Sequence, residues 1–262
     1  MTDADTTRAR FAATASRMAA FGDTRVERIR AQLSALLELS GTERALDVGT
    51  GTGPLAFALA PLVNEVIGLD PVPEMLAEAR RRAAKFENVS FVAGFGDRLP
   101  FGDATFDVTM CGRTLHHVDR PVALVAEMAR VTRISGHVVV LDQVAPEDAG
   151  VASLQEQIER LRDPSHVRTL SDGELRGLLG AAGLVVERVE IEREERDLEG
   201  FLALAGCEGD GRRRVLEFVE ETVAAGRGGG IGLRREPTGF RFTILVGWYV
   251  ARHPGPAFSG TA

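Results

Sequence analysis

Short apolar runs alternate with amphipathic stretches through the first half of the chain. Five of these runs are five or six residues long and nearly continuous in apolar character, which is typical of β-strands buried on both faces. They occupy residues 45–49, 65–70, 89–93, 106–111 and 137–142. The helix-like stretches that separate them lie at about residues 54–62, 74–86 and 119–133. This alternation predicts an α/β fold in which helices cover both faces of a parallel sheet.

Helical and strand patterns also precede and follow this alternation. Apolar residues recur every three or four positions in residues 24–39, which predicts an amphipathic helix. Another helix is expected to begin at Ser171, because Ser171 and Glu174 have the spacing of a capping box. Residues 184–191 and 240–251 are predicted to form two late strands. No linker divides the chain, so we expect a single domain with an N-terminal helical cover (1–40), a core (41–191), a helical insert (192–239) and a last strand with a tail (240–262).

Composition places the chain among ordinary globular proteins and removes several classes of function. Of its 262 residues, 44% are hydrophobic and 26% are charged, and the formal net charge is -7 at pH 7. A protein that binds the backbone of nucleic acids needs a basic surface, so nucleic acid is not an expected partner. The apolar runs are shorter than the ~18 residues of a membrane span, and the charged N-terminal segment is unlike a signal peptide. We therefore expect a cytoplasmic protein without a membrane partner.

A glycine-rich turn links the first predicted strand to the helix that follows, in the segment ALDVGTGTGP. Such a turn lets backbone N–H groups and the start of a helix face a ligand without an intervening side chain. Asp70 ends the next strand, where a carboxylate can accept hydrogen bonds from both hydroxyls of a ribose. The glycine spacing alone leaves the cofactor open. Gly49, Gly51 and Gly53 form a GxGxG series. Together with Ala56, the last two also match the GxGxxA series of dinucleotide sites.

The motifs that follow this turn distinguish between the cofactors. LDVGTGTG is followed in order by VIGLDP, LPFGDATFDV, LHHVDRP and ARVTRISGHVVVLD. Over about residues 40–190, this series resembles class I S-adenosylmethionine (SAM)-dependent methyltransferases, in particular the small-molecule group related to the methyltransferases of ubiquinone and menaquinone biosynthesis. The resemblance implies a Rossmann-like α/β fold whose seven-stranded, mostly parallel sheet has an antiparallel last strand. It also implies SAM as the cofactor, residues 41–191 as the cofactor-binding core and a small molecule as the methyl acceptor.

The resemblance further implies which residues contact SAM. The glycine turn would pass beneath the methionine part, Asp47 would orient the methionine amino group, and Asp70 would hold the ribose. Val72 and Met75 would line the adenine. The complete set of implied cofactor residues is Asp47, Gly49, Thr50, Gly51, Gly53, Asp70, Pro71, Val72, Met75, Gly94, Phe95, Gly96 and Cys111.

One segment near the adenine departs from the family pattern. The family has a Gly-Asp-Ala triplet before the LPF segment, and its aspartate usually meets the adenine amino group. This chain has Gly94-Phe95-Gly96 instead, and Asp97 is the nearest carboxylate. Either Asp97 reaches the adenine, or backbone N–H groups bind its edge while Phe95 packs on its face. We favour the second arrangement.

The methyl acceptor is expected beyond the fourth strand, at the carboxyl end of the sheet where α/β proteins form their sites. Methyl transfer from a sulfonium is an in-line displacement that depends mainly on positioning, and it needs a base only when the acceptor must lose a proton. His116 and His117 lie here, and histidine titrates near neutral pH. We favour His117 as the base, oriented by Asp119. Arg113 is expected to bind a carboxylate, phenolate or carbonyl of the substrate, unless it forms a structural ion pair.

A second polar cluster, ERLRDPSHVR at residues 159–168, has two interpretations. In the first, it is a salt-bridged loop that braces the helical cover. In the second, Arg162 and His166 close over the substrate, because a subset of the same family pairs an Arg…His-His segment with an Arg-Asp-Pro-Ser-His stretch. The five histidines lack the spacing of metal ligands and the two cysteines are too few for a zinc site, so no metal is expected.

Three other functions fit part of the sequence. An enzyme that keeps SAM but catalyses a different reaction, such as a cyclisation, would carry the same cofactor residues, because a fold does not determine a function. A SAM-binding protein without catalysis would carry them too. An NAD-dependent short-chain reductase is disfavoured because it needs a Tyr and a Lys four residues apart, whereas the chain has only Tyr249 and Lys85. The sequence leaves the acceptor, the methylated atom and the oligomeric state open.

Overall fold

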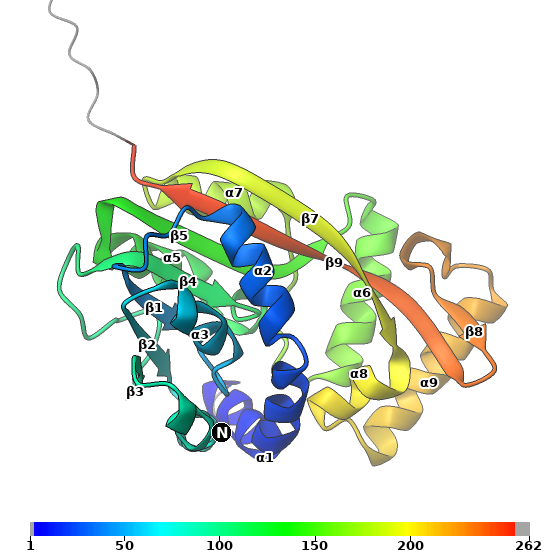
Figure 1. The fold of residues 1–262 in the computed structure, drawn as a ribbon. Helices are drawn as coiled ribbons and strands as arrows, with labels where there is room; N and C mark the ends of the chain where they lie inside the picture. Colours follow the sequence, from blue (N-terminus) through cyan, green and yellow to red (C-terminus); the bar gives the residue numbers. More distant parts are fainter. Residues whose placement is uncertain (1–2, 255–262) are drawn as a thin grey trace, which may run out of the picture.

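The computed structural model describes residues 3–254 and places a central sheet between two layers of helices (Figure 1). The main strands of this described part are β1 (Arg44–Val48), β2 (Glu65–Asp70), β3 (Val89–Ala93), β4 (Phe106–Gly112), β5 (Thr132–Ala145), β7 (Val185–Asp197) and β9 (Gly239–Arg252). Their order is β3-β2-β1-β4-β5-β9-β7, and β9 is antiparallel to both neighbours whereas the others run parallel. Two short strands, β6 (Leu170–Ser171) and β8 (Arg234–Glu236), pair with β5 and β9. The predicted mostly parallel sheet with an antiparallel last strand is confirmed.

Helices connect and flank these strands. They are α1 (Asp3–Asp23), α2 (Val26–Leu36), α3 (Pro54–Leu59), α4 (Pro73–Arg82), α5 (Pro121–Val131), α6 (Ala149–Arg162), α7 (Asp172–Ala181), α8 (Leu198–Ala205) and α9 (Gly209–Ala224), with 3-10 turns η1 (Ala60–Leu62), η2 (Ala83–Lys85), η3 (Leu115–His117) and η4 (Gly229–Ile231). The helices α3, α4 and α5 begin at a proline, whose fixed φ and missing N–H suit the first helical position. Ser171 and Glu174 form the predicted capping box of α7. Within residues 3–254, no helix is both long and apolar enough to cross a membrane.

Hydrophobic residues form a core on each face of the sheet. Because successive side chains of a strand point to opposite faces, Ala45 and Leu46 of β1 enter different cores. Residues of α2, α3, α6, α8 and α9 cover one face, and residues of α5 and α7 cover the other. The last strand belongs to both cores, because Trp248 packs on one side of β9 and Tyr249 on the other.

The boundary between α5 and β5 differs from the predicted one. The helix expected to reach residue 133 ends at Val131, and the strand expected from residue 137 already begins at Thr132. The buried Thr132 hydroxyl donates to the Met128 carbonyl oxygen and lies 2.7 Å from Thr109 Oγ1 on β4. These contacts end the helix and attach the following residues to the neighbouring strand.

The strand β7 is longer than predicted and shortens the helical insert. It continues to Asp197 instead of ending at residue 191, and it pairs with β9 along nearly its whole length. Its outer half is rich in charged residues, so the sequence pattern lacks the apolar run that marks a buried strand. Residues 192–197 of the expected insert (192–239) therefore belong to the sheet, and β8 forms a second strand within the insert. The helices α8 and α9 occupy the rest of it.

The helix α1 connects the core of the protein to the insert (Figure 1). It packs against α4 on one side and against α8 on the other. Arg17 of α1 donates to the carbonyl oxygen of Ala203 in α8, and Asp23 at the end of α1 pairs with Arg82 of α4. A helical cover was predicted for residues 1–40, and the described helices of this segment are α1 and α2.

Candidate active site

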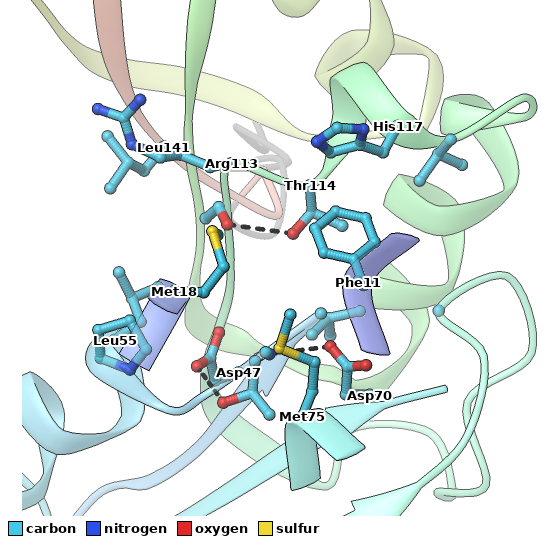
Figure 2. Close-up of a pocket in the computed structure, with 18 of the residues that line it drawn as sticks. Phe11, Met18, Asp47, Leu55, Asp70, Met75, Arg113, Thr114, His117 and Leu141 are labelled. Atoms are coloured by element: carbon cyan, nitrogen blue, oxygen red, sulfur yellow. Dashed lines mark hydrogen bonds between the residues drawn. The ribbon is translucent and has the colours of Figure 1, made fainter. Parts of the chain in front are cut away.

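A cavity of about 740 Å³ lies at the carboxyl ends of β1, β2 and β4, and α1 and α2 supply another part of its wall (Figure 2). Most residues that the sequence analysis selected are part of its lining. Those that line it are Asp47, Gly49, Thr50, Gly51, Asp70, Pro71, Val72, Met75, Phe95, Gly96, Arg113 and His117. Those that lie outside the lining are Gly53, Gly94, Cys111 and His116.

The three glycines of the turn after β1 have left-handed backbone conformations for different reasons. Their φ angles are +72° at Gly49, +53° at Gly51 and +91° at Gly53. A Cβ at Gly51 would meet no described atom within 4 Å, so this position faces open cavity space. A Cβ at Gly49 would lie 2.6 Å from Thr114 Oγ1, and a Cβ at Gly53 would lie 2.7 Å from the Phe57 ring. Gly51 therefore lets a ligand approach the backbone, whereas the other two let the turn pack.

The carboxylate of Asp70 is held by the backbone at the end of β2. The N–H of Gly51 donates to Oδ2 at 2.8 Å, and the N–H of Val72 donates to Oδ1 at 2.9 Å. Burial outweighs these two bonds and raises the pKa of Asp70 to about 6. Each carboxylate oxygen keeps a further lone pair that a ligand hydroxyl can use.

Asp47 is buried in β1, beside the strand that carries Asp70. The hydroxyl of Thr50 donates to its Oδ2 at 2.6 Å. Burial is the main cause that raises the pKa of Asp47 to about 7, and the nearby charge of Asp70 adds to it. Two buried carboxylates on one wall are stabilised by a ligand that brings a cation and hydroxyl donors. The ammonium and ribose groups of SAM have this chemistry, so the residues present fit the cofactor.

Beyond Asp70 the cavity wall becomes apolar. Val72 and Met75 are buried and pack against α1. Phe95 also lines the cavity, and its side chain is 48% exposed. Asp97 lines the same region, but its carboxylate accepts a hydrogen bond from Arg120 at 2.8 Å. The guanidinium of Arg8 lies over the Phe95 ring, with its central carbon 5.9 Å from the ring centroid, so Phe95 and Asp97 each have a cationic neighbour.

The turn after β4 is braced by Asp142 of β5. Arg113 has a left-handed φ of 55°, and its N–H donates to the carbonyl oxygen of Leu141 at 2.6 Å. The carboxylate of Asp142 accepts from the N–H of Leu115 at 2.7 Å and pairs with Nδ1 of His116. His116 is buried and lies outside the cavity lining, so the structure gives it a bracing position, and of the two candidate histidines only His117 lines the cavity.

His117 faces the cavity from the same turn (Figure 2). Its Nδ1 lies 2.9 Å from the carbonyl oxygen of Ser165, which can only accept, so Nδ1 carries the proton and Nε2 keeps a lone pair. Burial and the neighbouring His116 lower the pKa of His117 well below its usual range. The orienting contact expected from Asp119 is made by Ser165 instead, and the ring of Phe11 packs edge-on against the imidazole.

The segment ERLRDPSHVR is divided between the end of a helix and the cavity wall. Glu159 and Arg162 lie in the last turn of α6, where they form a buried ion pair at 2.7 Å. Asp163 pairs with Arg10 of α1. These contacts hold α1 of the helical cover against α6, as the first interpretation of the sequence expects. The segment begins in the last turn of a helix, whereas that interpretation expected a loop. Arg162 is outside the cavity lining, so only His166 has the position that the second interpretation requires.

Four arginines surround one glutamate on the side of the cavity away from Asp70, where Figure 2 shows Arg113. We call this group the arginine cluster, and its members are Arg25, Arg28, Arg113 and Arg196, each paired with Glu194. Burial opposes the ionisation of Glu194, but the charge of Arg113, then Arg25, outweighs it and lowers the pKa of Glu194 to about 2. Only Arg113 of this cluster could be selected from the sequence. The four arginines come from three distant segments of the chain, and no short motif indicates that they meet.

Comparison with known proteins decides the family. Residues 46–140 match the protein family described as Methyltransferase domain. The uncharacterized methyltransferase YcgJ of Bacillus subtilis is 33% identical over 184 residues, which cover 70% of the chain and 73% of YcgJ. The chain belongs to this methyltransferase family. The methyltransferase is also similar to the demethylmenaquinone methyltransferase of Beutenbergia cavernae, with 40% identity over 210 residues that cover 76% of the chain and 83% of the relative.

Solved structures have the same fold as this methyltransferase. The crystal structure of YcgJ has a TM-score of 0.80 at 26% identity and covers 87% of the methyltransferase and 100% of YcgJ. BH2331, a candidate methyltransferase of Bacillus halodurans, also has a TM-score of 0.80, at 25% identity, and covers 86% of the methyltransferase and 98% of the relative. The protein is therefore a SAM-dependent methyltransferase, as its motifs predict.

Proposed function

We propose that this methyltransferase transfers the methyl group of SAM to a small-molecule acceptor by in-line displacement. The observation that supports this proposal is a single cavity with two chemically different walls (Figure 2). One wall carries the glycine turn and Asp70, and the other carries Arg113 and His117. A volume of about 740 Å³ is in the range of pockets that enclose small molecules, which are ~300–1,000 Å³.

The first wall has the groups that SAM requires. Gly51 leaves room for the methionine part, Asp47 can bind the ammonium group, and Asp70 can accept from the ribose hydroxyls. Val72 and Met75 offer an apolar surface to the adenine. When bound, SAM supplies a methyl group that is activated by the positive charge of its sulfonium.

The second wall positions the acceptor and accepts its proton. Phe11 and Met18 of α1 extend over the cavity and exclude water from part of it, which favours a displacement that depends on the alignment of two reactants. His117 presents Nε2 as a proton acceptor, because Nδ1 already donates to Ser165. A phenol or an enol can lose its proton to this nitrogen as the methyl group arrives, whereas a protonated amine must lose its proton before its nitrogen can attack.

The test follows radioactive methyl groups. The purified protein is incubated with [methyl-14C]SAM and a metabolite extract passed through a filter that removes macromolecules. We expect label in the small-molecule fraction, less of it with Asp70→Ala, and an unchanged amount with Arg213→Gln, which removes two exposed ion pairs on the surface of α9. Hydrogen bonds to a charged group contribute ~1.5–3 kcal/mol each, so Asp70→Ala should weaken the binding of S-adenosylhomocysteine (SAH) at least tenfold.

Two results would contradict the proposal. If SAH binds but no label leaves SAM, the protein uses the cofactor for another reaction, such as a cyclisation, or does not catalyse one. If Asp70→Ala binds SAH as tightly as the unmodified protein, the ribose lies elsewhere and the donor wall is wrongly assigned.

A further inference from the structure

We infer that the acceptor carries an anionic group, a carboxylate or a phosphate, and that the arginine cluster binds this group at the end of the cavity away from Asp70. This inference rests on the proposed function and names the substrate class for the same cavity. Arg25, Arg28 and Arg113 belong to the cavity lining together with Glu192 and Glu194, so the whole charged group faces the space that an acceptor would occupy.

The cluster has more positive than negative charge. Glu194 is the carboxylate that all four arginines share, and Glu192 lies 3.9 Å from Arg28 as a second, more distant one. Four guanidinium groups against these two carboxylates leave a surplus of two positive charges. A surplus of this kind at a half-buried site is unfavourable without a further anion, because charges taken out of water need a partner.

The lowered pKa values of two of these arginines agree with a surplus of positive charge. Burial and the charge of Arg113 lower the pKa of Arg25 to about 9, and the same two causes lower the pKa of Arg196 to about 10. Both groups remain protonated at neutral pH but are poorly compensated. The Nε of Arg196 is buried without a hydrogen-bond partner among the described residues. An anion that enters the cluster would relieve this imbalance, and guanidinium groups bind carboxylates and phosphates through paired N–H donors.

Apolar side chains surround the cluster, so the rest of the acceptor should be apolar. Ile29 of α2 and Trp248 of β9 line this end of the cavity with Leu141. The guanidinium of Arg25 also lies over the ring of Phe21, with its central carbon 5.0 Å from the ring centroid. An anion attached to an aromatic or aliphatic body would fill both kinds of surface.

The methionine carboxylate of SAM is a second source of an anion for the same arginines. It would neutralise one positive charge and leave another, so the charge balance alone supports an anionic acceptor as well. The experiment must therefore be done with the cofactor position filled.

The test uses the SAH-loaded protein and pairs of probes that differ only in charge. Isothermal titration compares 3-phenylpropionate with its methyl ester, and phenyl phosphate with phenol. We expect each anion to bind at least tenfold more tightly than its neutral partner. Arg28→Gln should reduce this preference severalfold, and Glu194→Gln should increase it because the competing carboxylate is gone. Arg28 is 56% exposed, so its replacement leaves the fold intact even if Glu194→Gln does not fold.

The control is Arg213→Gln, which removes an exposed arginine that is not part of the cavity lining and should leave the preference unchanged. Equal binding of acid and ester to the SAH-loaded protein overturns the inference. So does a result in which Arg28→Gln weakens SAH but not the preference for anions, because the cluster then binds only the cofactor carboxylate. Failure of the unmodified protein to bind SAH would instead contradict the proposed function, and the two failures are therefore distinguishable.

Discussion

In the turn after β1, one glycine is needed for cofactor binding and another for folding. Gly49, Gly51 and Gly53 all have positive φ, yet a side chain at each position would meet a different environment. Only Gly51 faces open cavity space, whereas Gly49 is packed against Thr114. Substitutions at these two positions should therefore have different consequences, although a sequence motif treats them alike.

We expect Gly51→Val to abolish SAH binding and to lower stability only modestly. The valine side chain would occupy the ligand space, and its left-handed backbone costs about 1–2 kcal/mol. Gly49→Ala should be more damaging to the fold, because its Cβ would lie 2.6 Å from Thr114 Oγ1. Titration calorimetry with SAH and thermal unfolding measure the two effects. Tight SAH binding by Gly51→Val would show that the cofactor does not pass over this turn.

Asp47→Asn should make the free protein more stable and should weaken its binding of the cofactor. The pKa of Asp47 is raised to about 7 from 3.8, so the folded state binds more protons than the unfolded state between these values. Stability from this group is therefore lost as pH rises through this window, by up to about 4 kcal/mol. Asparagine does not titrate, so its stability advantage over the unmodified protein should grow from pH 4 to pH 8.

Urea unfolding across this pH range checks the stability part, and SAH titration at pH 8 checks the binding part. A stability difference that is constant with pH would mean that Asp47 is ionised throughout.

His117→Gln should remove the acidic limb of the pH profile of kcat/KM once an acceptor is known. The pKa of His117 is lowered by burial and by His116, so the limb should lie below pH 6.5. A general base of this kind contributes ~10²–10⁴-fold to the rate. His116→Gln is the comparison, and it should lower the melting temperature through the lost Asp142 contact while keeping the limb. If both variants keep the limb and lose less than tenfold in rate, positioning alone drives the transfer.

At the scale of elements, the core strands could be predicted because burial alone specifies them. β2 and β3 have the predicted bounds, β1 begins and ends one residue earlier than predicted, and β4 ends one residue later. The pattern is less informative for β5 and β7. The start of β5 is polar and pairs with β4 at Thr132, and the outer half of β7 is polar and pairs with β9. It also does not predict α6, because residues 159–162 are as charged as a loop. Contacts between distant segments determine these elements, and a local pattern does not contain them.

The helix α1 is the element that we expect to control the exchange of ligands. It contributes Phe11 and Met18 to the cavity wall, and Arg17 ties it to α8 outside the cavity. Arg17 also pairs with Glu208 at the start of α9. An exposed ion pair contributes ~0–1 kcal/mol, so Arg17→Ala should raise the dissociation rate of SAH up to about fivefold. Stopped-flow displacement of SAH measures this rate. The association rate and the melting temperature should change little, and an unchanged dissociation rate would show that α1 does not limit release.

At the scale of the whole molecule, the arginine cluster connects three parts of the chain through the carboxylate of Glu194. These parts are the start of α2, the turn that follows β4, and the strand β7. The arginines of the cluster are 25, 28, 113 and 196, so no local motif indicates that they meet. The cofactor wall could be predicted because its residues lie in two contiguous motifs after neighbouring strands. The acceptor wall could be predicted only for Arg113, His117 and, in one of two interpretations, His166, because α1, α2 and β7 reach it through the tertiary fold.

Glu194→Gln should destabilise the protein at neutral pH and progressively less in acid. The pKa of Glu194 is lowered to about 2 from 4.5, so its contribution is present above pH 4.5 and is lost as pH falls toward 2. A shift of this size corresponds to about 3 kcal/mol. Urea unfolding at pH 7 and at pH 4 measures the difference between variant and unmodified protein. A difference that grows toward pH 4 would contradict the sign of this linkage.

The position of β9 between β5 and β7 also sets an order of events during synthesis. The chain that follows β5, residues 146–252, is 107 residues long and ends with the strand that joins β7 to the rest of the sheet. At ~5–20 residues per second, a ribosome needs roughly 5–20 s to make it. Over that interval β5 has an unpaired edge, and such an edge can pair with another chain. A nascent chain that pauses before residue 239 therefore carries most of the cofactor wall together with an edge open to aggregation.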